Sequence, residues 1–268
     1  MDVSVLGPLI VGENGKSMVP SAGKQRQVLA LLVLRGDRTV QVGTLMEELW
    51  GGCIPRSGAT TLQTYILQLR NKIATLWPEG SGRSPKDLLT TCFGGYMLKI
   101  GGGRSDLRDF ETYARNGMSA YEAGDLKSAV SLFDRALDQW DGEALMDVPH
   151  GRILQREIVS LEQMRMNVLE RRIDACLRLG RQTALLPDLG VLVDEHPMHE
   201  GLRAQLILAL YRSGNVRRAL EEFQRLRASL VEELGIEPSM RLRRLHQAIL
   251  AGDPILETEG EVLPQLIG

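Results

Sequence analysis

The sequence predicts a mainly α-helical protein with a small β component, in which an N-terminal winged helix-turn-helix domain precedes an all-α domain of TPR-like helical repeats. Three observations support this fold class. Residues 1 to 100 combine short strand-like segments with three helical ones, a triple glycine follows at 101 to 103, and the remaining chain repeats one helical pattern. Three consecutive glycines are typical of a boundary, because the backbone there is too free for a regular element. We therefore expect domains at 1–103 and 104–251, with a flexible tail at 252–268.

The length and the charge distribution also indicate two domains. A chain of 268 residues exceeds the size of roughly 100 to 200 residues that is usual for one domain. Residues 1 to 103 carry 11 Lys and Arg against 7 Asp and Glu, a net charge of +4, whereas the remainder carries 21 against 27, a net charge of −6. The two parts thus differ in electrostatic character.

The composition excludes several classes of protein. The longest apolar runs, such as residues 28–34, are far shorter than the roughly 20 residues that a membrane span needs. No basic segment followed by a long apolar stretch marks a secretory signal. Cys53, Cys92 and Cys176 are odd in number and far apart, which favours reduced thiols over a disulfide framework or a metal site. We expect a soluble, cytoplasmic, nucleoid-associated protein with no metal, no cofactor and no membrane contact.

The first hundred residues follow the element order of a winged helix. Apolar residues interrupted by turn residues between positions 3 and 19 predict a small antiparallel sheet. Residues 24–35 and 43–50 have helical apolar spacing, and a third helix is predicted by apolar residues three and four apart from Leu62 to Leu76. Residues 87–100, with two glycines at their centre, predict a terminal β-hairpin.

The third helix lies in a stretch without acidic residues, from Leu49 to Pro78. At 100° per residue, its outward face consists of Thr60, Thr64, Gln68 and Asn71, flanked by Thr61, Gln63, Arg70 and Lys72. A carboxylate would repel the phosphates of a duplex, whereas Gln and Asn can pair with adenine and Thr can touch a thymine methyl. The pattern therefore predicts a helix in the DNA major groove, the alternative being a polar surface helix that lacks Glu by chance.

These residues also resemble a known family. The run LMEELWGGCIPRSGATTLQTYILQLRNKI with the later GGYML is similar to the OmpR/PhoB-type winged helix of the SARP family, the antibiotic-pathway activators of actinobacteria. In that family a helical bacterial transcriptional activator domain follows, and residues 104–251 fit it. The resemblance implies an activator of an antibiotic or secondary-metabolite gene cluster. It also implies binding to double-stranded DNA at direct repeats, self-association on DNA, and recruitment of RNA polymerase holoenzyme.

The resemblance assigns roles to individual residues. It implies base contacts by Thr64 and Gln68, and phosphate contacts by Thr60, Thr61, Tyr65 and Arg70. Asn71 and Lys72 are candidates for DNA binding from their place on or beside the outward face alone. The loop from Gly51 to Arg56 faces RNA polymerase in the family, which makes Ile54 and Arg56 candidates for that contact. The chain departs from the family at the wing, where Cys92 and Phe93 stand in place of an arginine, so we ask whether Arg83 or Lys86 reaches phosphates instead.

The second half contains a repeated helical motif. Tyr121, Gly124, Ala129 and Phe133 recur with identical spacing at 211, 214, 219 and 223, and Gly180 lies 34 residues before Gly214. This is the tetratricopeptide period, in which small residues let paired helices pack closely. An insertion at 140–154 interrupts the array. Such a surface usually binds protein or another copy of itself, although a generic helical bundle is the alternative.

Other motifs predict structure rather than chemistry. Residues 12–17, GENGKS, lack the first glycine of a phosphate-binding loop and are interpreted as a turn between strands. His196 and His199 lack further ligands for zinc and favour a cap or an inter-repeat turn, and Ser57 lacks the context of a nucleophile. We expect no enzyme. The alternative functions are a TPR scaffold whose winged helix binds protein, and a repressor with the same fold.

Overall fold

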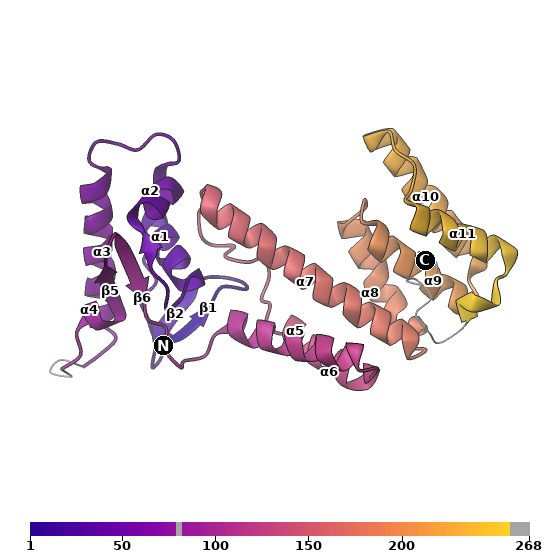
Figure 1. The fold of residues 1–268 in the computed structure, drawn as a ribbon, viewed down its shortest axis with the longest axis horizontal. Helices are drawn as coiled ribbons and strands as arrows, with labels where there is room; N and C mark the ends of the chain where they lie inside the picture. The colour runs from indigo at the N-terminus through magenta and orange to yellow at the C-terminus, as the bar shows by residue number, and fades with distance from the viewer. Residues whose placement is uncertain (79–81, 258–268) are drawn as a thin grey trace. The chain divides into compact units, whose positions relative to one another are not determined.

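The computed structural model describes residues 1–78 and 82–257. Its contacts divide the chain into two compact units. Unit 1 combines residues 1–113 with 135–166, and unit 2 combines 114–134 with the described residues from 167 onward. The first unit therefore contains the whole winged helix together with a later segment of the chain (Figure 1).

Unit 1 begins with the small antiparallel sheet that the sequence predicts. Strands β1 (Asp2–Ser4), β2 (Ile10–Glu13) and β3 (Lys16–Ser17) pair in that order. The turn between β2 and β3 places Asn14 at φ +53° and Gly15 at φ +76°, the left-handed conformation that a tight hairpin requires. The GENGKS segment is thus a strand turn, as predicted.

Three helices and a second sheet complete the winged helix, which confirms the predicted fold class. Residues predicted to face the core, from Leu62 to Leu76, are buried in the third of these helices and directly after it. The second sheet has the order β4-β6-β5, so the terminal hairpin is the wing. The sequence did not predict the short β4 and α4. In chain order the elements are α1 (Gly23–Leu34), β4 (Val40–Gln41), α2 (Val42–Trp50), α3 (Gly58–Ala74), α4 (Pro85–Leu88), β5 (Leu89–Cys92) and β6 (Gly95–Leu98).

The insertion between the first two repeats packs onto the winged helix. The backbone N–H groups of Asp141 and Leu145 donate to the carbonyls of Leu6 and Val5, at 2.7 and 3.1 Å. Gly7 faces the same segment, and a Cβ there would lie 2.4 Å from the carbonyl oxygen of Asp141. Glycine is therefore required at this position by the close approach of two backbones.

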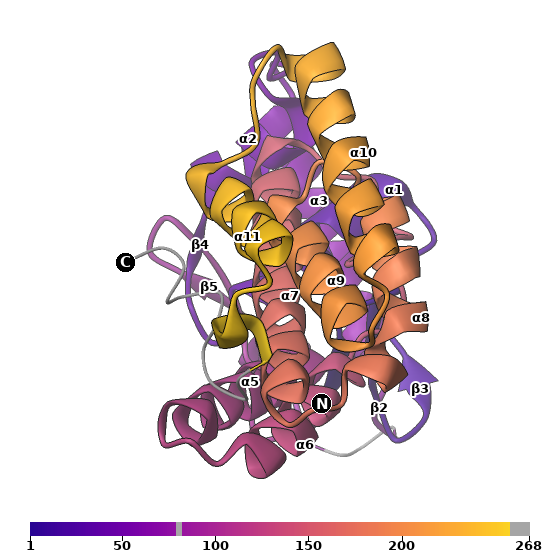
Figure 2. The same cartoon turned by 90° about the vertical axis from the view of Figure 1, so that its right-hand side faces the viewer.

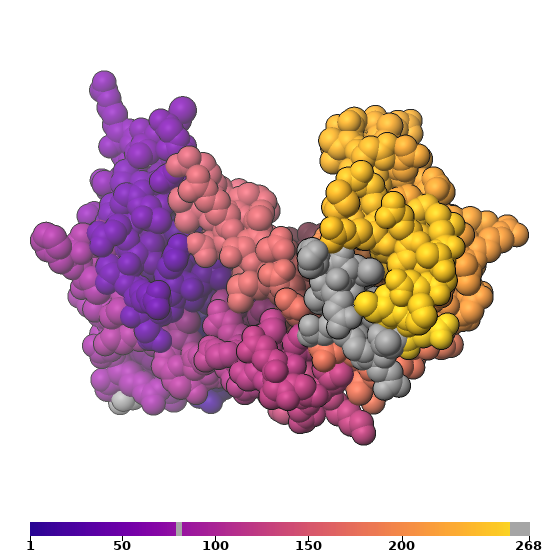
Figure 3. Space-filling model, turned by 45° about the vertical axis from the view of Figure 1, so that its right-hand side comes forward, coloured from indigo at the N-terminus to yellow at the C-terminus, as the bar shows by residue number. Residues whose placement is uncertain are grey.

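Three carboxylates connect the winged helix to later segments of unit 1. Asp106 accepts from the N–H groups of Val5 and Leu6 at 2.8 and 2.9 Å, and burial raises the pKa of its carboxyl. Asp147 accepts from the N–H of Leu9 at 2.7 Å and pairs with Arg26. The third, Glu48, accepts from three backbone N–H groups at the start of α7 (Arg152–Arg178). Figure 3 shows the first part of α7, in salmon, against the indigo and purple winged helix.

Unit 2 contains the repeat array. Gly124, Gly180 and Gly214 have φ of +80°, +69° and +76° and each joins two consecutive helices, which agrees with the predicted repeat. A Cβ on Gly117 would lie 2.7 Å from the Phe133 ring, so this pair of helices packs closely because one residue has no side chain. In chain order the helices after the winged helix are α5 (Asp106–Glu122), α6 (Leu126–Leu137), α7, α8 (Gln182–Glu195), α9 (Glu200–Arg212), α10 (Val216–Leu234) and α11 (Met240–Ala251). The first parts of α5 and α7 and the end of α6 belong to unit 1.

The last helices of unit 2 lie side by side, with α9 next to both α8 and α10 (Figures 1 and 2). Their core contains an ion pair between Arg203 of α9 and Glu222 of α10. Only 4% of the surface of Arg203 is exposed. Beyond α11, Pro254–Glu257 forms a 3-10 helix with Leu256 buried. The rest of the tail predicted at 252–268 lies outside the described residues.

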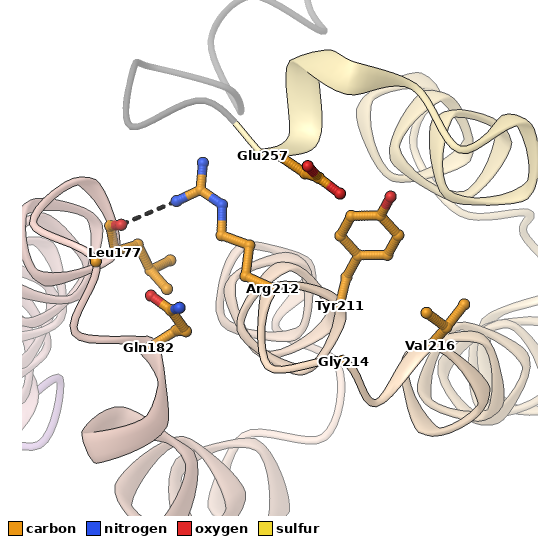
Figure 4. Close-up of a pocket in the computed structure, with 8 residues that line it drawn as sticks. Leu177, Gln182, Tyr211, Arg212, Gly214, Val216 and Glu257 are labelled. Carbon is orange, nitrogen blue, oxygen red and sulfur yellow. Dashed lines mark hydrogen bonds between the residues drawn. The ribbon is translucent and has the colours of Figure 1, made fainter.

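A cavity of about 440 Å³ opens beside α9 in unit 2 (Figure 4). The guanidinium of Arg212 crosses its wall and donates to the carbonyls of Leu177 and Leu256, at 2.9 and 2.8 Å. Tyr211 and Glu257 point toward the same space. The arginine thus joins the end of α7 to the 3-10 helix, which gives it a structural role in the wall.

Candidate DNA-binding site

Helix α3 presents one side to the core of unit 1 and the other to solvent. Its buried side chains, Leu62, Ile66, Leu69 and Ile73, share one face. Thr60, Thr64 and Asn71 are exposed on the opposite face, where the sequence predicts them. Figure 1 shows α3 along the edge of unit 1, beside the wing strands. The structure therefore leaves a complete helix face free for a partner.

The exposed face contains one apolar residue that the sequence analysis missed. Leu67 is 58% exposed and lies on the helix between Thr64 and Asn71. The predicted buried face consists of apolar residues three and four apart, including Ile66 and Leu69, and Leu67 was given no role. A rotation of 100° per residue separates Ile66 and Leu67 and would have placed Leu67 on the outward face.

Gln68 lies on the flank of α3 that faces α1. Its side chain is exposed, and its Oε1 accepts from Nε2 of Gln25 at 2.5 Å. Thr61, Tyr65 and Lys72 are half-buried on this flank. The residues predicted for DNA binding therefore divide into an outward row and a flank next to α1.

Arg70 occupies a different place from that expected of a phosphate contact. Its Nε and Nη2 donate to the carbonyl of Leu89 at 3.0 and 2.8 Å, and Nη2 also donates to Oγ1 of Thr91 at 2.8 Å. Both partners belong to β5. The guanidinium therefore connects α3 to the wing, a role that depends on long-range pairing.

The wing ends in an apolar tip. Phe93 is fully exposed at the turn between β5 and β6, and residues 88–98 contain no charge. Arg83, considered as a substitute for the absent arginine, pairs with Glu13 at 3.2 Å and lies over the Trp77 ring. Lys86 is exposed in α4. Arg83 is thus held by an acidic side chain, whereas Lys86 extends from the surface of α4.

The loop between α2 and α3 is open to solvent. Ile54 is 49% exposed and Arg56 is exposed. Trp50, at the end of α2, is half-buried, and the ammonium of Lys24 lies 5.1 Å from the centre of its ring. The two residues predicted to contact polymerase are therefore accessible, whereas Trp50 belongs to the packing of the domain.

The remaining candidate sites have structural roles. His199 is the N-cap of α9, where its Nδ1 accepts from the N–H of Leu202 at 3.3 Å, as the cap interpretation predicts.

Over residues 1–78 and 82–257, no cluster of His, Cys, Asp and Glu suited to a metal is present. Cys53, Cys92 and Cys176 are free thiols. No helix in the described ranges is long and apolar enough to cross a membrane.

Known proteins match both parts of the chain. The family model described as "Transcriptional regulatory protein, C terminal" matches residues 15–98, and "Bacterial transcriptional activator domain" matches residues 105–250. The chain is 47% identical to Regulatory protein DnrI of Streptomyces peucetius, covering 98% of this chain and 97% of that protein. It is 36% identical to Regulatory protein AfsR of Streptomyces coelicolor, over 94% of this chain and 24% of AfsR.

A solved structure agrees with the fold. EmbR of Mycobacterium tuberculosis, determined in complex with a low-affinity phosphopeptide, superposes with a TM-score of 0.86 at 30% identity, over 99% of this chain and 67% of EmbR. The two family models occur in the order that the sequence predicts, and the similarity to DnrI extends over nearly the full length of both chains. The chain belongs to the SARP family of transcription regulators.

Proposed function

We propose that this protein is a sequence-specific DNA-binding activator of a gene cluster for an antibiotic or another secondary metabolite. Helix α3 lies in the major groove, with Thr60, Thr64 and Asn71 toward the bases and Lys72 toward a phosphate. Gln25 holds the amide of Gln68 at the edge of this surface, where Gln68 also reaches a base. Arg70 supports the wing.

One observation carries the proposal, namely an exposed helix face in a segment without carboxylates. The major groove is about 12 Å wide and admits one helix, and α3 exposes a face of hydroxyl and amide groups between Thr60 and Asn71. Two acidic side chains in neighbouring segments have partners of their own. Glu13 accepts from Trp77 and pairs with Arg83, which offsets its negative charge, and Asp87 caps α4.

The test is duplex binding by the full chain at several salt concentrations. Asn71→Ala should weaken binding to the cognate promoter by about 1 to 3 kcal/mol and leave random duplex nearly unchanged, whereas Lys72→Ala should weaken both and lower the salt slope by about one. Arg217→Ala removes an exposed charge from unit 2 and serves as the control without effect. Binding that is weak at every salt concentration would favour the protein scaffold instead.

We further propose that two copies bind direct repeats head to tail. One helix and an uncharged wing contact few bases, so a second linked copy would raise the avidity strongly. Insertion of about five base pairs between the half-sites turns the second one to the opposite face of the duplex, and about ten restore it. We expect affinity to fall with five and recover in part with ten. A site indifferent to spacing would mean that monomers bind independently.

The exposed loop between α2 and α3 is our proposed contact with RNA polymerase holoenzyme. Ile54→Ser and Arg56→Ala change side chains that point to solvent, so we expect them to preserve DNA affinity and reduce transcription in a purified system. Thr75→Ala, at the other end of α3, is the control. Unchanged transcription would place the contact elsewhere. Repression by the unmodified protein would overturn activation and retain DNA binding.

A further inference from the structure

We propose that Leu67 reads the C5-methyl group of a thymine in the operator, an inference that rests on the proposed DNA binding by α3. The residue is 58% exposed, although it belongs to a helix whose other large aliphatic side chains are buried. It lies three residues after Thr64 and four before Asn71. Side chains at these spacings are neighbours on one helix face, so Leu67 occupies the middle of the outward row.

The chemistry of the major groove restricts what Leu67 can contact. Guanine, cytosine and adenine present hydrogen-bond donors and acceptors there, and thymine alone among the four bases adds a methyl group. A leucine placed against a donor or acceptor would remove water without replacing its hydrogen bond, which is unfavourable. When the leucine packs against the thymine methyl, both apolar groups are removed from water, which is favourable.

Other occupants of this face fit less well. A protein partner would bury the hydroxyl and amide groups of Thr60, Thr64 and Asn71 around a single leucine, and such polar groups each need a hydrogen-bond partner when buried. Base edges supply those partners on either side of the methyl group. The position of one apolar side chain within a polar row therefore matches a thymine next to base pairs that are read by hydrogen bonds.

The experiment replaces each thymine of the half-site by uracil, one at a time, which removes only the methyl group. Binding of the full chain is measured by fluorescence anisotropy at fixed salt. For the unmodified protein we expect one position at which uracil weakens binding about fourfold, the effect of one buried methyl group. Leu67→Ala should bind the thymine site more weakly than the unmodified protein and show no further loss with uracil at that position.

The control is Leu250→Ala, which truncates another exposed leucine, in α11 of unit 2, and should retain the full uracil effect. We also replace the critical thymine–adenine pair by a cytosine–guanine pair, with or without a methyl group at C5 of the cytosine. The duplex with 5-methylcytosine should bind the unmodified protein more tightly than the duplex with unmethylated cytosine. A uracil effect that persists in Leu67→Ala would assign the methyl contact to a threonine and overturn the inference. Specific, salt-dependent binding by the unmodified protein without any uracil effect would overturn the inference and leave the proposed DNA binding intact. An unmodified protein that shows no specific binding would overturn both the inference and the proposed function.

Discussion

Replacing Glu222 by alanine should lower the free energy of unfolding of unit 2 by about 3 to 5 kcal/mol, the usual cost of removing one partner from a buried ion pair. The Arg203 guanidinium, 4% exposed, loses its carboxylate partner and keeps only a weak bond to the Val193 carbonyl at 3.4 Å. Since a cation left in the core has neither water nor a counter-charge, we expect unfolding of unit 2 at lower temperature and lower urea concentration.

The neighbouring residue provides the control for this change. Glu221 pairs with Arg217 on the surface, so Glu221→Ala should cost well under about 1 kcal/mol. Replacing both buried partners, with Arg203→Met and Glu222→Leu, should recover much of the lost stability because no charge remains buried. Equal effects of Glu221→Ala and Glu222→Ala in urea unfolding would show that the buried pair contributes nothing specific.

The second large effect is expected for Glu48→Ala in unit 1, which should cost about 2 to 4 kcal/mol, since hydrogen bonds to a charged group contribute about 1.5 to 3 kcal/mol each and are not additive. Glu48 is 2% exposed and accepts from the N–H groups of Gly151, Ile153 and Leu154. The first N–H groups of a helix have no partner within it. Without the carboxylate, the buried N–H of Leu154 and the part-buried N–H groups of Gly151 and Ile153 lose their acceptor.

Hydrogen exchange of the amides at residues 151–154 would measure this effect directly, together with the melting temperature. The control is Glu47→Ala, because Glu47 pairs with Arg152 at the surface and should change neither quantity by much. Glu48→Gln retains an acceptor and should give an intermediate loss. If protection of these amides survives in Glu48→Ala, the capping role is wrong.

Local patterns explain what could be predicted from the sequence. The spacing of Leu62, Ile66, Leu69 and Ile73 predicts both the existence of α3 and its buried face, because one period governs both. The turn at Asn14 and the repeat glycines were predictable for the same reason, since each depends on backbone preferences of one or two residues. The predicted order of sheet, helices and hairpin followed from these local signals.

Interactions between distant residues account for what was missed. Arg70 has the sequence context of a phosphate contact, and only the pairing of β5 beside α3 shows that Leu89 and Thr91 bind its guanidinium. The role of Glu48 likewise depends on backbone groups more than a hundred residues later. In both cases the partner lies far away in the sequence, so the residues next to Arg70 or Glu48 do not indicate it.

The interleaving of unit 1 along the chain has a consequence for biosynthesis. The N–H groups of Val5, Leu6 and Leu9, between β1 and β2, find their acceptors at Asp106 and Asp147, so this connection stays without its acceptors until the ribosome has made about 150 residues. At roughly 5 to 20 residues per second, that delay lasts on the order of ten seconds. Contacts so far apart also slow folding itself. A nascent chain ending at the triple glycine would therefore expose apolar surface and depend on chaperones, even though it already contains all of α3.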